Sequence, residues 1–146
     1  MLTIFLDFDG VLHRESDFWH EFCRLPALEQ TLERAGLDQL EIILSTTWRH
    51  RLPLAELLEP FSKQLKARIA GVTPSTPANT EYQRWEECHK WLNDNHRSGP
   101  WLAIDDTAME FPAGCANLFH VTGDNGISDG ELVRLEETIA RLIQTT

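Results

Sequence analysis

Residues 5–13 read FLDFDGVLH and lie almost at the start of the 146-residue chain. Apolar residues lead into Asp7, a second aspartate follows at Asp9, and Gly10 then interrupts the apolar pattern. The apolar run 2–6 ahead of them predicts a buried strand that ends in a loop. Two carboxylates at the end of a buried strand repel each other and lose hydration, so we expect the pair to have a chemical use.

The rest of the chain alternates apolar strands with helical patterns. Further strands are expected at LEIILS (40–45), ARIAGVT (67–73), WLAIDD (101–106) and NLFHVT (117–122). Helices are expected as two short segments within 16–35, the second running from Pro26 to a C-cap at Gly36, then after Pro53, over 80–95, and after an N-cap at Ser128. Continuously apolar strands between helices are typical of a parallel sheet covered on both faces. The expected fold class is therefore α/β.

Polar side chains follow three of these strands: Asp7 and Asp9 after the first, Ser45 after the second, and the pair Asp105–Asp106 after a later one. In such sheets the ligand site lies beyond the carboxyl ends of the strands. We expect four carboxylates to converge there, and oxygen-rich sites of this kind suit Mg²⁺. One carboxylate can attack phosphorus while the other transfers protons, as covalent phosphoryl transfer requires.

Three motifs in order resemble the phosphatases of the haloacid dehalogenase (HAD) superfamily. DFDGVL is similar to the family's opening signature, ILSTTW to its second motif and WLAIDD to its fourth. The resemblance covers nearly the whole chain. It implies a single domain over residues 1–146 with a three-layer α/β/α Rossmann-like fold. The closest pattern is that of HAD domains of RNA-repair proteins and polynucleotide 3′-phosphatases.

The resemblance also implies roles for individual residues. Asp7 would be the nucleophile and a Mg²⁺ ligand, and Asp9 the general acid/base, whose backbone carbonyl also binds the metal. Ser45 would hydrogen-bond the transferring phosphoryl group. Asp105 would complete the metal site, with Asp106 as a ligand or a supporting residue.

The family's third motif is a single Lys or Arg that neutralises charge between nucleophile and phosphate. The basic residues available for it are Lys63, Lys66, Arg68, Arg84 and Lys90. We choose Arg84, because QRWEECHKWL (83–92) resembles the helix led by a basic residue that precedes the fourth motif in polynucleotide 3′-phosphatases and RNA-repair HAD domains. Arg68 is the second choice.

Further residues near these motifs have candidate roles in binding phosphate or substrate. Gly10 and Thr46 flank the expected phosphate position. Arg49 is a candidate substrate ligand, with a surface ion pair as the alternative. Trp48 is expected in the core, although stacking on a base is the alternative. His13 follows the Asp-Phe-Asp-Gly segment at residues 7–10, the DxDG loop, where contact with substrate is a minor alternative.

HAD enzymes select substrates with inserted caps, and neither insertion point here has room for a large one. The first, residues 11–39, holds only a small helical insertion, and the second is the connector TPSTPANT (73–80). An open site admits bulky substrates such as nucleic-acid ends, or depends on a partner to close it.

Composition and charge restrict the binding partners and the cellular compartment that we expect for the protein. The net charge of −10 and a pI near 4.9 argue against broad, non-specific nucleic-acid binding. No apolar run approaches the roughly 18 residues needed to span a bilayer, the N-terminus lacks a basic leader, and three unpaired cysteines favour a reduced, cytoplasmic chain.

We therefore expect a Mg²⁺-dependent phosphomonoester hydrolase that forms an aspartyl-phosphate and acts on a phosphorylated small molecule or nucleic-acid end. One alternative is a non-catalytic or regulatory HAD-fold module that binds a phosphorylated partner. Another is a phosphotransferase or nucleotidase acting on metabolites.

Overall fold

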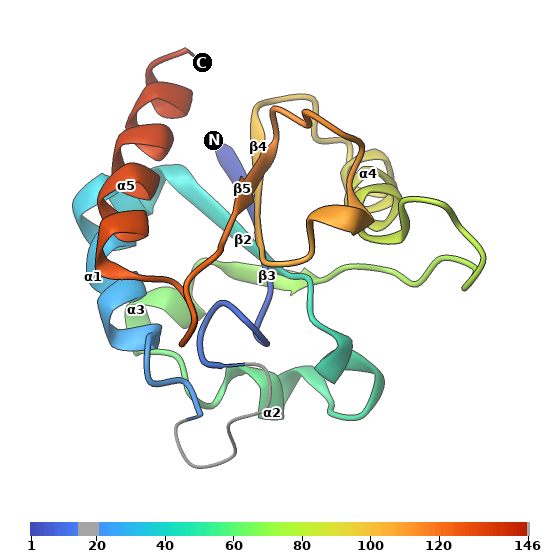
Figure 1. Cartoon of the computed structure of the whole chain (residues 1–146). Coiled ribbons are helices and arrows are strands. Elements are labelled where there is room, and N and C mark those ends of the chain that lie inside the picture. Colours follow the sequence, from blue (N-terminus) through green and yellow to red (C-terminus); the bar gives the residue numbers. More distant parts are fainter. Residues whose placement is uncertain (15–20, 146) are drawn as a thin grey trace.

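A single parallel sheet forms the centre of the computed structural model, which describes residues 1–14 and 21–145 (Figure 1). Its five strands lie in the order β3-β2-β1-β4-β5, and every neighbouring pair is parallel. The strands are β1 (Leu2–Leu6), β2 (Leu40–Leu44), β3 (Ile69–Val72), β4 (Trp101–Asp105) and β5 (Leu118–His120). All five begin within the stretches expected from the sequence.

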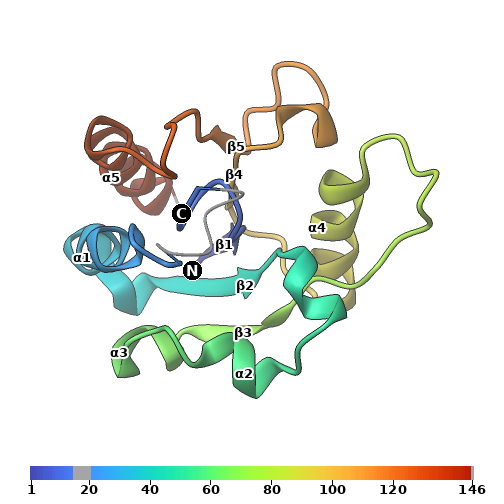
Figure 2. The same ribbon diagram turned by 60° about the horizontal axis from the view of Figure 1, so that its bottom comes forward.

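Helices cover both faces of this sheet (Figure 2). The helices α1 (Leu25–Gly36) and α5 (Asp129–Gln144) pack together on one face, and α4 (Gln83–Asp94) covers the other. Successive β1 residues point to opposite faces, so Ile4 joins the core beneath α1 and α5. Phe5 contacts Trp91 of α4, with ring centroids 6.0 Å apart. The α/β class with three layers is confirmed.

Short helices connect the main elements. They are η1 (Leu37–Gln39), η2 (Thr47–His50), α2 (Leu54–Leu58), α3 (Lys63–Lys66) and η3 (Ala108–Glu110). The helix α3 was not expected from the sequence. It is a single turn capped by Ser62, whose hydroxyl accepts a bond of 3.2 Å from the Leu65 N–H. Of the two short helices expected in 16–35, the second is α1. The first lies largely outside the described residues.

The small helical insertion expected at residues 11–39 includes the helix α1. Residues 25–36 form α1, whose Leu28 and Leu32 are fully buried against the sheet. This helix therefore belongs to the core. Residues 11–24 remain between β1 and α1, and the described part of them contains turns and no helix.

The register of the three central strands brings their carboxyl ends together. Leu6 of β1 lies opposite Leu44 of β2 and Ile104 of β4. The Asp7 N–H donates to the Ile104 carbonyl at 3.2 Å, and the Ser45 N–H donates to the Leu6 carbonyl at 2.8 Å. Asp7, Ser45 and Asp105 are thereby held at one edge of the sheet.

Among the described residues, no helix has the length and apolar character needed to cross a membrane. The three cysteines are free, and Cys88 is fully buried on α4. Burial, with Asp105 and Glu87 nearby, raises the pKa of the Cys88 thiol well above its usual range. Cys88 therefore packs as a small apolar residue.

Candidate active site

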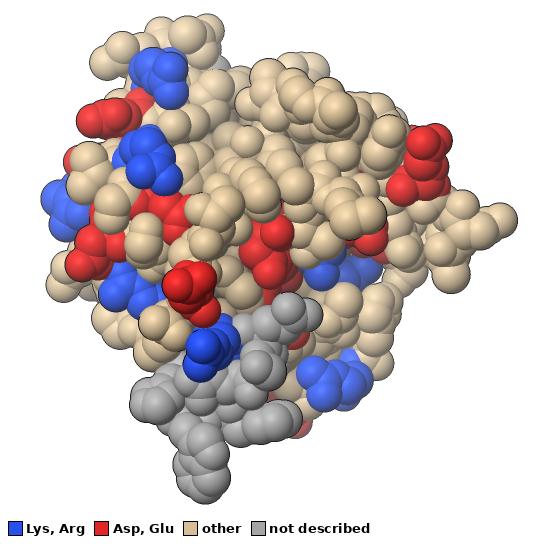
Figure 3. Space-filling view, viewed as in Figure 1, with Lys and Arg blue, Asp and Glu red and all other residues tan. Residues whose placement is uncertain are grey.

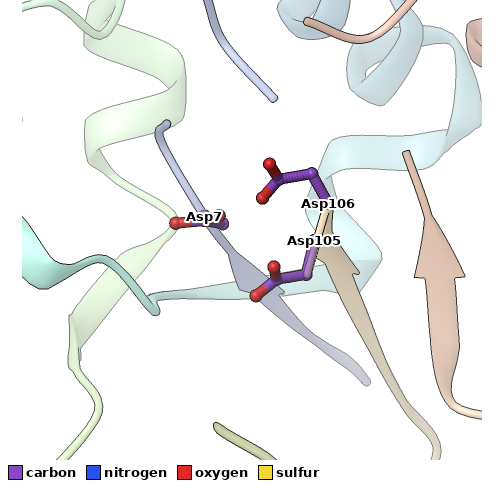
Figure 4. A group of neighbouring side chains, drawn as sticks. All are labelled: Asp7, Asp105 and Asp106. Carbon is purple, nitrogen blue, oxygen red and sulfur yellow. The ribbon is translucent and has the colours of Figure 1, made fainter. Parts of the chain in front are cut away.

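Three carboxylates meet at the carboxyl ends of β1 and β4 (Figure 4). Asp7, Asp105 and Asp106 each offer an oxygen, and these oxygens lie within 4.8 Å of one another. Asp7 and Asp105 are each only 2% exposed. Burial and the neighbouring charge of Asp105 therefore raise the pKa of Asp7 well above its usual range, although Arg84 opposes the rise.

Arg84 extends from the first turn of α4 into this cluster. Its Nη1 lies 3.0 Å from Asp7 Oδ1 and 3.0 Å from Asp105 Oδ2, and donates to the Ser45 carbonyl at 2.7 Å. Burial alone would lower the pKa of Arg84, but the charges of Asp7 and Asp105 raise it above its usual value. The guanidinium group therefore stays charged and partly offsets the two buried carboxylates.

The other basic candidates for the third motif lie elsewhere. Arg68 donates to the carbonyls of Leu40 and Asp38, both at 2.9 Å, at the start of β2 and thus at the opposite edge of the sheet. Lys90 forms an exposed pair with Asp94 on α4, and Lys63 and Lys66 lie on α3. Of the five, the structure brings Arg84 to the carboxylates. Its catalytic role stays a prediction.

Gly10 allows Asp106 to reach the cluster. The residue has a φ of +79°, and a Cβ atom added there would lie 1.9 Å from Asp106 Oδ2. Only glycine avoids both the strained backbone and this overlap. The close approach supports the expectation that Gly10 shapes the loop around the site, while direct contact with phosphate is untested.

Thr107 was not among the residues predicted for the site. Its N–H donates to Asp105 Oδ1 at 2.9 Å, and its hydroxyl donates to Asp106 Oδ1 at 3.2 Å. An Asp side chain that accepts from the N–H two residues later forms an Asx turn. The sequence Asp-Asp-Thr contained this signal, because Asx turns depend only on local spacing.

The carboxylate of Asp9 is not part of the cluster, so three of the four expected carboxylates converge there. Asp9 Oδ2 accepts from the Trp48 Nε1–H at 3.0 Å, and Asp9 Oδ1 lies 2.8 Å from His13 Nε2. The strand β1 ends at Leu6, so Asp9 lies in the loop beyond it, where the alternation of strand side chains no longer sets the direction of its carboxylate. The predicted metal contact of Asp9 is through its backbone carbonyl, which this side-chain orientation does not affect.

The residues after β2 are buried close to the cluster. Ser45 is 3% exposed and Thr46 is fully buried. The Thr46 hydroxyl caps η2 by accepting from the Trp48 N–H at 3.2 Å. This bond shows a structural role for Thr46. The phosphate-binding roles of Ser45 and Thr46 remain predictions.

Arg49 forms a buried ion pair, in contrast to the exposed one considered from the sequence. Its Nη2 lies 2.9 Å from Glu87 Oε2, and the two side chains are only 7% and 5% exposed. Arg49 Nη1 also donates to the Thr46 carbonyl at 2.7 Å. A cavity of 190 Å³ borders Arg49, Glu87 and Arg84. Glu87 lies one turn after Arg84 on α4 and was not predicted from the sequence as a site residue, because its partner Arg49 is 38 positions away.

The donor set of the cluster fits a divalent cation. Three carboxylate oxygens lie close enough to share one ion, and hard oxygen ligands of this kind are those that Mg²⁺ binds. Burial, and after it the charge of Asp105, raises the pKa of Asp7. A bound cation would offset the negative charge of these neighbouring carboxylates.

The parallel sheet, the DxDG loop and this carboxylate cluster define a domain of the HAD superfamily. Residues 3–132 match the family described as HAD domain in Swiss Army Knife RNA repair proteins, and the chain belongs to this family. The match runs from β1 into α5 and confirms the resemblance seen in the motifs. Searches of curated proteins and of solved structures found no match.

Proposed function

We propose that the protein is a Mg²⁺-dependent phosphomonoester hydrolase that works through an aspartyl-phosphate on Asp7. The observation that carries the proposal is the position of Asp7, which is buried at a strand end beside Arg84 and the Asp105–Asp106 pair. A nucleophilic carboxylate needs a neighbouring positive charge when it approaches a phosphate, because the two anions otherwise repel each other. Arg84 supplies one such charge.

The reaction divides into two displacements. In the first, an Asp7 oxygen attacks phosphorus, the bond to the leaving-group oxygen breaks, and Asp9 gives its proton to that oxygen. In the second, Asp9 takes a proton from water as the water oxygen attacks phosphorus, which releases phosphate and restores Asp7. Ser45 lies at the next strand end and would donate a hydrogen bond to the phosphoryl group.

Asp7, Asp105 and Asp106 would hold Mg²⁺ through their side chains, and Asp9 through its backbone carbonyl. When bound, Mg²⁺ supplies positive charge for the phosphate oxygens and for the crowded carboxylates. Arg84 cannot neutralise this charge alone, since its single positive charge already faces both Asp7 and Asp105.

For the substrate, we propose a phosphorylated nucleic-acid end or a nucleotide. The family takes its description from RNA repair proteins, and between β3 and α4 the chain has only a connector without helix or strand. A site without a large cap admits a bulky leaving group.

The first test is hydrolysis of p-nitrophenyl phosphate with Mg²⁺ and with EDTA, by wild type and by Asp7→Asn. We expect turnover only with the metal, and a loss of at least about a thousandfold in Asp7→Asn, because the nucleophile is removed. Asp38→Asn is the matched control. Asp38 is exposed next to the start of β2, at the opposite edge of the sheet, and its variant should keep full activity.

If the wild-type protein shows no metal-dependent turnover, the proposed hydrolase activity is refuted. If such a protein still bound inorganic phosphate in a manner that depends on Asp105, the non-catalytic module would be favoured. Where turnover is present, a panel of 3′-phosphorylated and 5′-phosphorylated oligonucleotides beside mononucleotides separates nucleic-acid ends from metabolites as substrates.

A further inference from the structure

The rings of Trp48, which is partly buried, and of His13, which is buried, contact both carboxylate oxygens of Asp9. Trp48 Nε1–H donates to Oδ2 at 3.0 Å, and His13 Nε2 lies 2.8 Å from Oδ1. The His13 side chain is 3% exposed, whereas that of Asp9 is 34% exposed. The two rings therefore hold the carboxyl group from the protein side and leave part of it accessible.

The hydrogen bond at the other nitrogen of His13 determines which nitrogen carries the proton. The backbone N–H of Phe22 donates to His13 Nδ1 at 3.1 Å. Because Nδ1 accepts this bond, the neutral ring carries its proton on Nε2 and donates it to Asp9. Phe22 has a φ of +57°, which is rare for a bulky side chain. Backbone strain of this kind persists where surrounding contacts enforce it, and it is frequent at functional sites.

Ring packing fixes the direction of both N–H groups. Phe8, His13, Phe22 and Trp48 form an aromatic cluster, in which Trp48 lies 5.5 Å from Phe8, 5.6 Å from His13 and 5.4 Å from Phe22 between ring centroids. His13 and Phe22 are 5.2 Å apart in an edge-on arrangement. Neither donor ring can turn without disturbing its neighbours, so the position of the Asp9 carboxyl group is set by this cluster.

We propose that His13 and Trp48 are positioning residues for Asp9 as general acid, an inference that rests on the proposed function. Each carboxyl oxygen has a second lone pair beside the one that accepts the ring N–H. The proton can sit on that lone pair and pass to the leaving-group oxygen as its bond to phosphorus breaks. Proton transfer requires hydrogen-bond distance to that oxygen, so a carboxyl group free to rotate would lose efficiency.

The experiment measures kcat/KM at saturating Mg²⁺ for aryl phosphates that range from 2,4-dinitrophenyl to phenyl phosphate. This parameter reports cleavage of the phosphorus–oxygen bond and not the later hydrolysis of the aspartyl-phosphate. The dinitrophenolate departs without a proton, whereas phenolate is a poor leaving group and needs one. A positioning role therefore predicts losses that grow as the leaving group becomes poorer.

For His13→Ala and Trp48→Phe we expect kcat/KM on phenyl phosphate to fall about 10- to 100-fold, which is part of the roughly 100- to 10,000-fold that a general acid contributes. Activity on 2,4-dinitrophenyl phosphate should fall less than about threefold. Asp9→Asn removes the general acid itself, so its loss of kcat/KM on each substrate is the largest that a misplaced Asp9 could cause. His13→Gln keeps an N–H donor close to the position of Nε2 and should recover most of the phenyl phosphate activity.

Trp101→Phe is the matched control, because it makes the same ring change at the start of β4, at the edge of the sheet away from the site. Urea unfolding checks that each variant folds, and if His13→Ala does not, His13→Gln and Trp48→Phe carry the test. Equal losses on all substrates, or no loss on phenyl phosphate, would overturn the positioning role alone. No turnover of any aryl phosphate by wild type would instead overturn the proposed function and this inference with it.

Discussion

At the scale of single residues, Gly10 is required at the site because a side chain at this position would overlap Asp106. Gly10 combines a positive φ with an Asp106 carboxylate directly over its Cα. Gly114 has a similar φ of +70°, but a Cβ atom added there would meet nothing within 4 Å. A substitution at Gly114 therefore changes stability through the backbone alone. The same substitution at Gly10 adds the free-energy cost of displacing Asp106.

We expect Gly114→Ala to lower the free energy of unfolding by about 1–2 kcal/mol, the usual cost of a left-handed conformation for a residue with a Cβ. Gly10→Ala should lower it further, and should also weaken Mg²⁺ binding, because Asp106 must move. Urea unfolding in EDTA and calorimetric titration with Mg²⁺ measure the two effects. Unchanged Mg²⁺ affinity in Gly10→Ala would show that Asp106 is not a metal ligand.

At the scale of elements, the start of α5 organises the loop that follows β5. Glu131 is 2% exposed and completes a capping box with Ser128. Its carboxylate also accepts from the N–H groups of Thr122 and Gly123, at 2.7 and 3.1 Å. The same loop reaches the DxDG segment, since the Ile127 N–H donates to the Val11 carbonyl at 2.8 Å. Glu131 thus joins the helix to the loop, and the backbone of the loop is hydrogen-bonded to Val11, directly after Gly10.

Burial tends to raise the pKa of Glu131, but hydrogen bonds from Thr122 and Ser128 outweigh it, and the pKa is lower than the usual 4.5. A lowered pKa in the folded state means that Glu131 stabilises the protein above the unfolded-state value. This contribution is lost as the pH falls through the lower, folded value. Stability should therefore decrease in acid in part because Glu131 is protonated.

Glu131→Gln should lower the free energy of unfolding at neutral pH by about 1–3 kcal/mol, because buried N–H donors lose acceptors. The difference from wild type should shrink as the pH falls below 4.5, where wild type loses its carboxylate as well. Urea midpoints across this pH range measure the effect. Glu137→Gln, an exposed change on the same helix, is the control. A difference in unfolding free energy between wild type and Glu131→Gln that stays constant with pH would contradict the role of Glu131 ionisation.

At the scale of the whole molecule, charge limits how the protein meets its substrate. The net charge is −10. On the one face that Figure 3 presents, basic and acidic side chains are interspersed, and the described residues of that face form no continuous basic area. Extended contact with many phosphates requires Lys and Arg in numbers. A nucleic-acid substrate would therefore be held mainly at its terminal phosphate.

We expect labelled oligonucleotides to bind Asp7→Asn with Mg²⁺ only when they carry a terminal phosphate, because a chain with a net charge of −10 attracts internal phosphates weakly. Fluorescence anisotropy measures the affinity, and inorganic phosphate should compete. The affinity should depend weakly on salt. Tight binding of an unphosphorylated strand with a steep salt dependence would contradict this expectation and indicate a basic surface for the backbone.

The sequence determined the fold class and the strand ends that carry the site. Both depend on local patterns: continuous apolar runs predict buried parallel strands, and the residue that follows each run lies at the carboxyl edge. Asp7, Ser45 and Asp105 could be placed in this way before any contact was known. Ser128 was predicted as the cap of the last helix for the same reason, and the structure adds its capping-box partner Glu131, three residues later.

Tertiary structure decided which side chains meet across the fold. Five basic residues were open for the third motif by sequence, and the position of α4 against the sheet brought Arg84 to Asp7, 77 positions away. The Asp9 carboxylate turned away from the other three because Trp48, 39 positions later, holds it. Such pairs depend on how helices and loops pack on the sheet, and no local periodicity encodes that packing.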